Sequence, residues 1–222
     1  MLCIPVIARD SDSAVKKIHE VEKQADISEI RLDLMDSFHL DQIIGAAKKP
    51  VIITYRSSRE GGEGNDDHSV VAGYLINAAR EKADYIDLEL SMPVEWRKKI
   101  MQDRGESRVI ISTHIMDHTP PGDELNILLE NSIRTDGDVV KIVTMAKSLE
   151  DNLRLLELVS SARKREINII AFCMGPTGRM SRVFSLLMGG YLTFTSLETG
   201  EESAPGQIPV NEMKHLLEYF KK

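Results

Sequence analysis

A lysine lies in the middle of a strongly apolar, β-branched run, Val139-Val140-Lys141-Ile142-Val143-Thr144. Burying a lysine as a cation is costly, so a strand this apolar should exclude it. A buried lysine that loses its proton is a neutral amine, the form that attacks a carbonyl carbon. Lys141 is therefore a candidate for imine formation with a carbonyl substrate. The alternative is a lysine on an edge strand that faces solvent.

Charged residues recur at strand-like spacing elsewhere in the chain. Residues two apart on a strand share a face, so Glu29, Arg31 and Asp33 are predicted to lie together, opposite an aliphatic face. In a barrel the aliphatic face packs against helices and the other face points inward. We expect a set of charged side chains to converge from five consecutive strands: Glu29, Arg31, Arg56, Asp87, Glu89, His114 and Lys141.

This inward set has two interpretations. Such a density of buried charge is costly unless the charges are paired and used. A buried ion-pair network that only ties strands together is the favoured interpretation for Asp33, Asp87 and Glu89 taken individually. Arg56, His114 and Lys141 lie at or near the C-terminal ends of their runs, where barrel enzymes carry their active sites.

The elements that position these residues alternate along the chain. Amphipathic stretches of helical length separate eight β-rich runs: 2–8, 27–34, 50–56, 84–90, 108–115, 139–145, 167–174 and 191–196. Strict alternation predicts a parallel sheet with right-handed crossovers. Eight units predict one compact (β/α)8 TIM barrel over residues 1–222, in the α/β class. A doubly wound sheet is the alternative, but it usually has a Gly-rich turn after its first strand, where this chain has Arg9-Asp10-Ser11.

Composition narrows the function classes. The formal net charge is −7 and no long Lys/Arg run is present, which argues against a nucleic-acid partner. No run approaches the ~18 apolar residues of a membrane span, and the short apolar start has no basic flank of a signal peptide. Cys3 and Cys173 lie in apolar runs without metal-like spacing. We expect buried free thiols and a cytoplasmic protein.

Three Gly-bearing loops follow predicted strands and could hold a substrate. Residues 56–64 form a flexible, charged loop in which Glu60 stands four residues after Arg56. Residues 175–182 suit a phosphate at a helix start or, with two arginines, an organic carboxylate. Residues 203–207 are typical of a plain Pro-Gly turn as well. Metal binding by Asp66-Asp67-His68 or Asp117-His118 is a weaker alternative, since neither has a partner at ligand spacing.

Six short segments, in order, resemble the type I 3-dehydroquinate dehydratase family. The resemblance runs from residue 29 to residue 207 in Glu29-Ile30-Arg31-Leu32-Asp33, Thr54-Tyr55-Arg56-Ser57 with Glu60-Gly61-Gly62, His114, Val140-Lys141-Ile142, Gly178-Arg179-Met180-Ser181-Arg182 and Ser203-Ala204-Pro205-Gly206-Gln207. Each segment alone is weak, but the six in order are highly specific. The resemblance implies a (β/α)8 barrel that dehydrates 3-dehydroquinate to 3-dehydroshikimate through an imine, in the shikimate pathway.

The resemblance also implies residue roles. Lys141 would form the Schiff base, His114 would transfer protons, and Glu60 would hold the imidazole tautomer as a carboxylate does beside many catalytic histidines. The implied substrate pocket consists of Glu29, Ile30, Arg31, Arg56, Arg182, Ser203 and Gln207. No metal or organic cofactor is implied, and a homodimer is suggested.

The chain departs from the family pattern at two places. Family members often have an aromatic residue before the histidine and Asp or Asn after it, where this chain has Thr113 and Ile115. We therefore expect the loop after the fifth strand, and with it the orientation of His114, to differ from the family pattern. Many members also begin with extra strands that close the bottom of the barrel. This chain begins almost directly with its first strand, so we expect no extended N-terminal hairpin.

Two rival functions stay open at this stage. A class I aldolase would also use a lysine on the sixth strand, with the loop at 175–182 as its phosphate site. A non-catalytic barrel that binds a small anion is the second rival. The segments at 60–62 and 203–207 favour the dehydratase over the aldolase, and the presence of both Lys141 and His114 argues against a site that has lost catalysis.

Overall fold

Eight parallel strands form a nearly closed barrel in the computed structural model, which describes residues 1–65 and 67–221. The strands are β1 (Leu2–Val6), β2 (Ile27–Arg31), β3 (Val51–Thr54), β4 (Tyr85–Glu89), β5 (Arg108–His114), β6 (Val139–Met145), β7 (Ile169–Met174) and β8 (Thr193–Phe194). Neighbours in space follow the order β7-β6-β5-β4-β3-β2-β1-β8. Tyr191 N–H donates to Ile169 O at 2.7 Å and brings the start of β7 against the segment before β8. The predicted (β/α)8 barrel is confirmed, and the doubly wound alternative is wrong.

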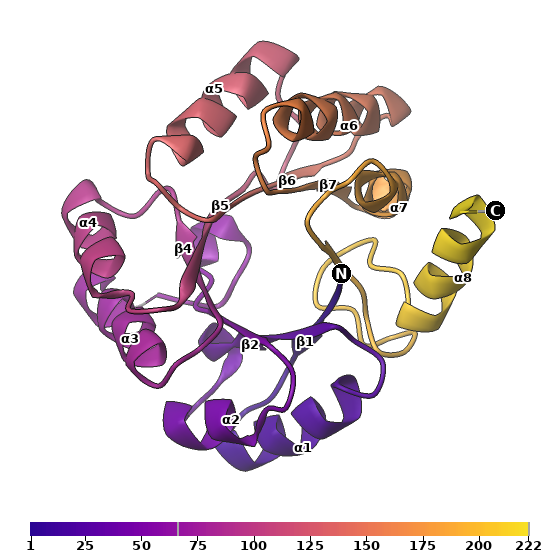
Figure 1. Cartoon of the computed structure of the whole chain (residues 1–222). Coiled ribbons are helices and arrows are strands. Elements are labelled where there is room, and N and C mark those ends of the chain that lie inside the picture. The colour runs from indigo at the N-terminus through magenta and orange to yellow at the C-terminus, as the bar shows by residue number, and fades with distance from the viewer. Residues whose placement is uncertain (66, 222) are drawn as a thin grey trace.

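Helices surround the strands as an outer ring (Figure 1). They are α1 (Ser11–Val21), α2 (Leu40–Ala46), α3 (His68–Arg80), α4 (Val94–Asp103), α5 (Gly122–Ile133), α6 (Leu149–Lys164), α7 (Arg179–Leu187) and α8 (Val210–Lys221). The turn after β1 is a helix cap, because Asp10 accepts from Ser13 N–H and Ser13 bonds back to Asp10 N–H. A capping box by Asp10 and Ser13 thus occupies the turn where a doubly wound sheet usually has its Gly-rich segment.

Alternation within the strands divides the interior into two layers. One side of each strand packs against the helices, for example through Ile30, Ile53 and Ile86. The other side fills the barrel with apolar residues toward the N-terminal ends of the strands, such as Ile27 and Ile52. The charged residues follow further along the same inward faces, toward the C-terminal ends. As a result, the bottom of the site is apolar and its walls carry charged side chains.

Most strands are shorter than the sequence predicts, and β2, β3 and β8 lose the most residues. β2 ends at Arg31 because residues 32–34 form a 3₁₀ turn, in which the Arg31 guanidinium donates to both carboxylate oxygens of Asp33 at 2.8 and 2.6 Å. The expectation that Asp33 continues the charged face of that strand is therefore wrong. β8 comprises only Thr193 and Phe194 of the predicted 191–196. Arg56 lies two residues beyond β3, in the following loop.

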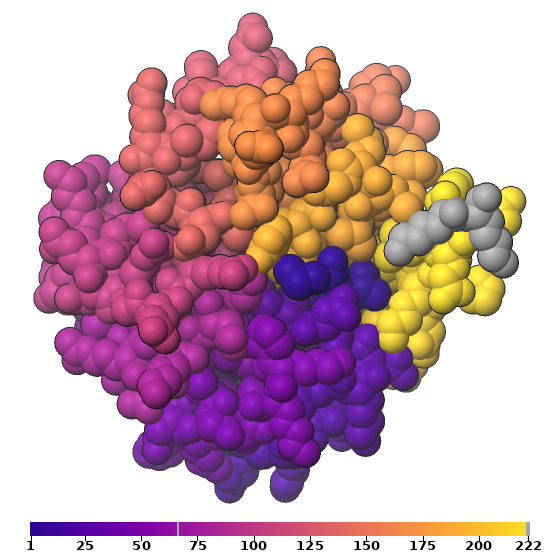
Figure 2. Space-filling view, in the orientation of Figure 1, coloured from indigo at the N-terminus to yellow at the C-terminus, as the bar shows by residue number. Residues whose placement is uncertain are grey.

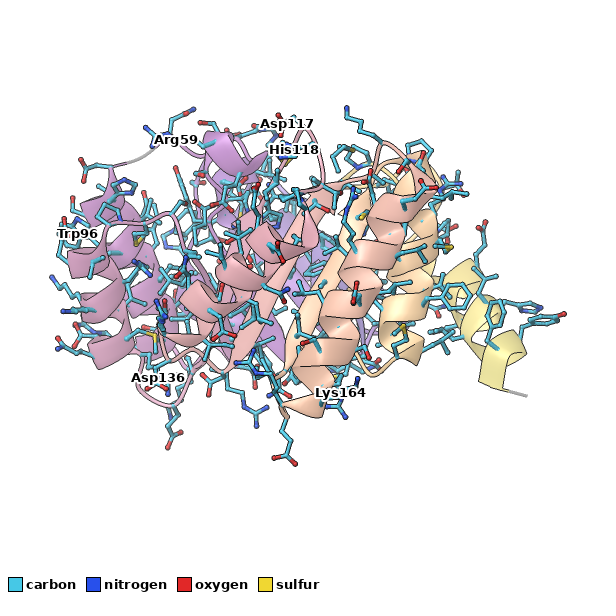
Figure 3. All side chains as sticks on the ribbon, turned by 90° about the horizontal axis from the view of Figure 1, so that it is seen from above. Arg59, Trp96, Asp117, His118, Asp136 and Lys164 are labelled. Carbon is cyan, nitrogen blue, oxygen red and sulfur yellow. The ribbon has the colours of Figure 1, made fainter. Side chains whose placement is uncertain are left out.

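The two ends of the barrel differ in what covers them. Arg59, Asp117 and His118 mark loops at one end, and Asp136 and Lys164 mark the opposite end (Figure 3). The first residues of the chain lie near the centre of the face shown in Figure 2. At the N-terminal ends of the strands, the hydroxyls of Tyr85 and Tyr191 are 2.6 Å apart, and Arg108 donates to both. β1 begins at Leu2.

Two further expectations concern cysteines and membranes. Cys3 and Cys173 are buried and free, as predicted. Within the described part of the chain, none of the helices combines the length and apolar character that a membrane span requires.

Candidate active site

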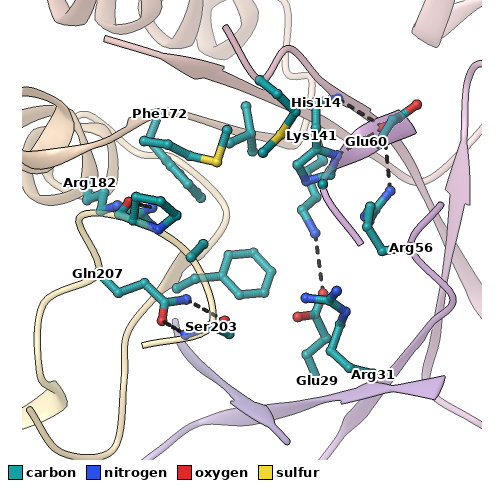
Figure 4. A pocket seen from close by; sticks show the side chains of 17 residues that line it. Glu29, Arg31, Arg56, Glu60, His114, Lys141, Phe172, Arg182, Ser203 and Gln207 are labelled. Atoms are coloured by element: carbon teal, nitrogen blue, oxygen red, sulfur yellow. Dashed lines mark hydrogen bonds and ion pairs between the residues drawn. The ribbon is translucent and has the colours of Figure 1, made fainter. Parts of the chain in front are cut away.

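A cavity opens among the loops that follow the strands, and most of the predicted site residues line it. Its wall includes nine of them: Glu29, Arg31, Arg56, Glu60, His114, Lys141, Arg182, Ser203 and Gln207. Figure 4 shows Lys141, His114 and Glu60 on one side of this cavity, with Arg182, Ser203 and Gln207 across from them. The inward convergence predicted from alternation is therefore observed.

Ile30 is the predicted site residue that the structure places elsewhere. Its side chain is fully buried in the layer between the strands and the helices. Strand alternation is the reason, since Glu29 and Arg31 point into the barrel and the residue between them points outward. A role for the Ile30 side chain in contacting substrate is therefore wrong.

The Lys141 side chain is buried and its nitrogen is surrounded by acidic and aromatic groups. Nζ lies 2.9 Å from Oδ2 of Asp87 and 3.4 Å from Oε1 of Glu29. It also lies 4.4 Å from the ring centroid of Phe194. Only 4% of the residue is exposed, so the edge-strand alternative is wrong. A primary amine thus stands at the wall of a cavity, in a fixed position.

Arg56 organises the acidic residues beside the lysine. Its guanidinium donates to Asp87 at 2.7 Å and to Glu89 and Ser112 at 3.0 Å each. Burial opposes ionisation of Asp87, but Arg56 and then Lys141 outweigh burial and hold the pKa of Asp87 well below its ordinary value. Asp87 is therefore a carboxylate that bridges the arginine and the lysine.

His114 and Glu60 form a buried pair at the rim of this network. Oε2 of Glu60 accepts from the backbone N–H of His114 and lies 3.0 Å from its Nδ1. Glu60 reaches this position from a 3₁₀ turn, Ser58–Glu60, which ends at Gly61 in the left-handed conformation with φ 83°. A Cβ at Gly61 would also meet Met116 at 2.4 Å. The left-handed backbone favours glycine here, since the flexible end of the Met116 side chain could move away from a Cβ.

The surroundings shift the proton affinities of both partners. Burial raises the pKa of Glu60 to about 7, with Arg56 opposing and Glu89 adding to the rise. Burial also lowers the pKa of His114 well below its usual value, and the cations Arg56 and Lys141 add to this. His114 is consequently a neutral imidazole near neutral pH. Because Nδ1 faces Glu60, Nε2 is the ring nitrogen left for other partners.

Arg182 presents unused hydrogen-bond donors at the opposite wall. Its guanidinium lies 4.4 Å from the ring centroid of Phe172, and Nη2 donates to Pro205 O at 3.1 Å. Among the described residues, none accepts a hydrogen bond from its buried Nε or Nη1. Burial lowers the pKa of Arg182 to about 9, and the group is still a cation near neutral pH. A buried cation with free donors is a receptor for an anion.

The loop after β8 completes this wall. Gln207 donates from Nε2 to Ser203 Oγ at 3.0 Å and accepts from Ser203 N–H at 2.8 Å. Gly206 has φ 81°, and a Cβ there would lie 2.2 Å from Gly175 O. Close backbone packing of these two loops therefore requires glycine and sets the position of Arg182 through Pro205. The interpretation of residues 203–207 as only a plain turn does not account for these contacts.

Some residues at the site were missed by sequence reasoning. Asp87, taken as a structural ion-pair residue, contacts Lys141 directly. Phe172 and Phe194 line the cavity beside the two cations, but an aromatic residue in an apolar run gives no distinguishing signal. Ser91, which bonds Glu60, lies in a loop without any motif. Alternation did place Asp87 on the inward face of its strand, but its interpretation as a structural ion-pair residue left out the contact with Lys141.

The weaker metal alternative finds no geometric support in residues 1–65 and 67–221. Asp66 lies outside the described residues. Elsewhere, none of the His, Cys, Asp and Glu side chains gather in a group of three that could hold a metal ion. His118 pairs with its neighbour Asp117 at 2.7 Å on the surface.

Comparisons with known proteins agree on one family. The family model described as type I 3-dehydroquinase matches residues 2–222. A 3-dehydroquinate dehydratase of Methanococcus maripaludis is 36% identical, covering 98% of this chain and 99% of its own length. The crystal structure of 3-dehydroquinate dehydratase from Geobacillus kaustophilus superposes with a TM-score of 0.89 at 27% identity, covering 99% of this chain and 90% of that one. A type I enzyme from Clostridium difficile, solved with covalently modified comenic acid, gives 0.87 at 27% identity, with 99% and 91% covered.

Proposed function

The chain belongs to the type I 3-dehydroquinase family, and we propose that it dehydrates 3-dehydroquinate to 3-dehydroshikimate through an imine on Lys141. The pathway is the shikimate route to aromatic amino acids. The observation that carries the proposal is a buried lysine nitrogen at the wall of a cavity, beside a neutral histidine held by a carboxylate. No metal or organic cofactor enters the proposed reaction.

Lys141 supplies the covalent step. In its neutral form, Nζ attacks the ketone carbon of the substrate, and the ketone oxygen leaves as water to give a protonated imine. The positive nitrogen then accepts electrons from the adjacent carbon–hydrogen bond better than the ketone would. Asp87 and Glu29, at 2.9 and 3.4 Å from Nζ, are placed to stabilise that charge.

His114 moves the protons. Glu60 holds Nδ1–H, so Nε2 is free to remove the proton from the carbon next to the imine. The imidazolium then gives that proton to the departing hydroxyl, which leaves as a second water. Hydrolysis of the product imine takes one water back and restores the lysine, so each turnover releases one water.

The opposite wall binds the substrate. Arg182 has two free donors for the substrate carboxylate. Glu29, Arg31, Ser203 and Gln207 line the cavity within reach of ring hydroxyls. Arg56 also lines it, but its guanidinium is already bonded to Asp87, Glu89 and Ser112. Its larger contribution in this proposal is to order the acidic residues.

The position of Arg182 favours the dehydratase over its two rivals, a class I aldolase and a non-catalytic barrel. Arg182 sits with Ser203 and Gln207 across from a histidine and a lysine, an arrangement suited to a hydroxylated ring acid. A homodimer and a cytoplasmic location remain predictions from the family and from the free cysteines.

Borohydride trapping tests the imine directly. We expect 3-dehydroquinate plus borohydride to leave substrate-derived mass on the peptide that contains Lys141, while enone absorbance rises in untreated samples. Lys147→Ala, an exposed lysine after the same strand, is the matched control and should trap normally. Lys141→Ala should not trap. Trapping or turnover that survives Lys141→Ala would exclude this mechanism, and sugar-phosphate aldehydes would be the next substrates to try.

A further inference from the structure

Glu60 is held on both of its carboxylate oxygens, and one of the two holders lies outside the substrate cavity. Oε2 accepts from His114. Oε1 accepts from the hydroxyl of Ser91 at 2.7 Å. Ser91 stands two residues past the end of β4, in the loop before α4. It thus connects the loop after β3 with the loop after β4.

The charges around Glu60 determine how much the hydroxyl of Ser91 contributes to keeping the Glu60 carboxyl ionised. Glu89 and Asp87 both favour protonation of the Glu60 carboxyl, in addition to burial. Arg56 opposes them, but its closest approach to Glu60 is 3.6 Å, whereas it lies 2.7 Å from Asp87 and 3.0 Å from Glu89. Arg56 is still the strongest influence that favours the ionised form of Glu60, and the hydroxyl of Ser91 adds to it as a direct donor. A hydroxyl that donates to Oε1 favours the ionised form of Glu60.

Ser91 also faces a second hollow, separate from the substrate cavity. This hollow of about 300 Å³ is lined by Ser91 and, among others, Ser57, Ser58, Asp67 and His68. Ser91 is an exposed residue, so water can serve its hydroxyl oxygen while its proton is given to Glu60. Ser91 does not line the substrate cavity, so its support for Glu60 comes from this neighbouring hollow, which Asp87 and Glu89 also line.

We propose that Ser91 is a positioning residue for proton transfer, whose hydroxyl keeps Glu60 ionised and directs its other oxygen to Nδ1 of His114. The inference rests on the proposed function, in which Nε2 of His114 has to be the base. Ser91 does not line the substrate cavity, so its effect is transmitted through Glu60 and His114. Substrate binding at the opposite wall is not involved.

The test is a comparison of pH profiles. In Ser91→Ala we expect the acidic limb of kcat to move up by about one pH unit, since a hydrogen bond to a charged group is lost. At about pH 6, kcat should fall about tenfold, while KM changes less than about twofold. Ser91→Thr, which keeps the hydroxyl, should restore the limb. Ser58→Ala removes a serine from the same hollow and should behave as wild type.

The outcomes separate this inference from a purely structural role. An unshifted limb in Ser91→Ala, or an equal shift in Ser58→Ala, would overturn it. The second readout needs no turnover. Nitrogen NMR of the His114 ring in ligand-free protein should show Nδ1 protonated. The pH at which the ring nitrogen shifts respond to protonation of Glu60 should be higher in Ser91→Ala. An unmoved titration would also overturn the inference. Failure of the wild-type chain to convert 3-dehydroquinate, with the NMR shift present, would instead refute the proposed function.

Discussion

The two walls of the cavity are built on opposite principles. On the wall from β2 to β6, each charge has partners: Asp87 bridges Arg56 and Lys141, and Glu60 holds His114. On the wall from β7 and β8, Arg182 is almost wholly buried yet keeps two donors without partners. The first wall is complete before any ligand arrives, while the second is incomplete without one. Pairing fixes the groups proposed for chemistry, and unused donors serve recognition.

The sharpest way to break the comparison is to remove the amine from the paired wall. Lys141→Ala should lower kcat by about four orders of magnitude or more, as loss of a covalent catalyst does. The variant loses a cation that pairs with Asp87 and Glu29, but the folded state should persist because Asp87 keeps its ion pair with Arg56. Enone formation measures turnover, and circular dichroism checks the fold. A loss smaller than about tenfold would mean that the paired wall is not the covalent one.

Neutralising Asp87, which pairs with both Arg56 and Lys141, should lower the stability of the folded state. Asp87→Asn leaves Arg56 and Lys141 buried without their shared carboxylate, and we expect a loss of about 3 kcal/mol in unfolding free energy. Urea unfolding measures it. Glu130→Gln breaks an exposed pair with Arg165 and is the control, with no measurable change expected. Equal stabilities in the two variants would show that the network around Asp87 is not cooperative.

Changes on the wall from β7 and β8 should weaken substrate binding and have little effect on stability. Arg182→Met keeps an apolar side chain against Phe172 but removes the cation, so KM should rise about 100-fold with a smaller change in kcat. Steady-state kinetics separate the two constants. Arg179→Met changes an exposed arginine in the same helix and should leave KM unchanged. An unaltered KM in Arg182→Met would remove Arg182 from carboxylate binding.

The smallest effect is the pH dependence of the wild-type chain. Burial, with Glu89 and Asp87, raises the pKa of Glu60 to about 7, and only the carboxylate form accepts a proton-bearing Nδ1. Activity should therefore increase with pH through neutrality, and kcat/KM should fall about tenfold per pH unit well below it. Because the pKa of His114 is lowered, the histidine itself is already neutral there. A flat profile from about pH 5.5 to 8 would contradict this assignment.

The sequence by itself determined the barrel and most of the site. Alternating strand and helix periodicities prescribe a parallel sheet, and the two-residue period of a strand sends Glu29, Arg31 and Lys141 inward. Those patterns depend on neighbours along the chain, so they can be read without coordinates. The same period, applied strictly, excludes Ile30 from the cavity. The family segments then identified Arg182, Ser203 and Gln207 in the late loops.

Only the tertiary structure decided how the charges are shared. The sequence places Asp87, Glu89 and Arg56 on one end of the barrel, but which carboxylate contacts Lys141 depends on the register of β4, β5 and β6. The ion pair between Arg31 and Asp33 accompanies a 3₁₀ turn that ends β2 at Arg31. The bond from Ser91 to Glu60 joins two loops 31 residues apart. Contacts between loops follow from packing in three dimensions, and no periodicity in the chain records them.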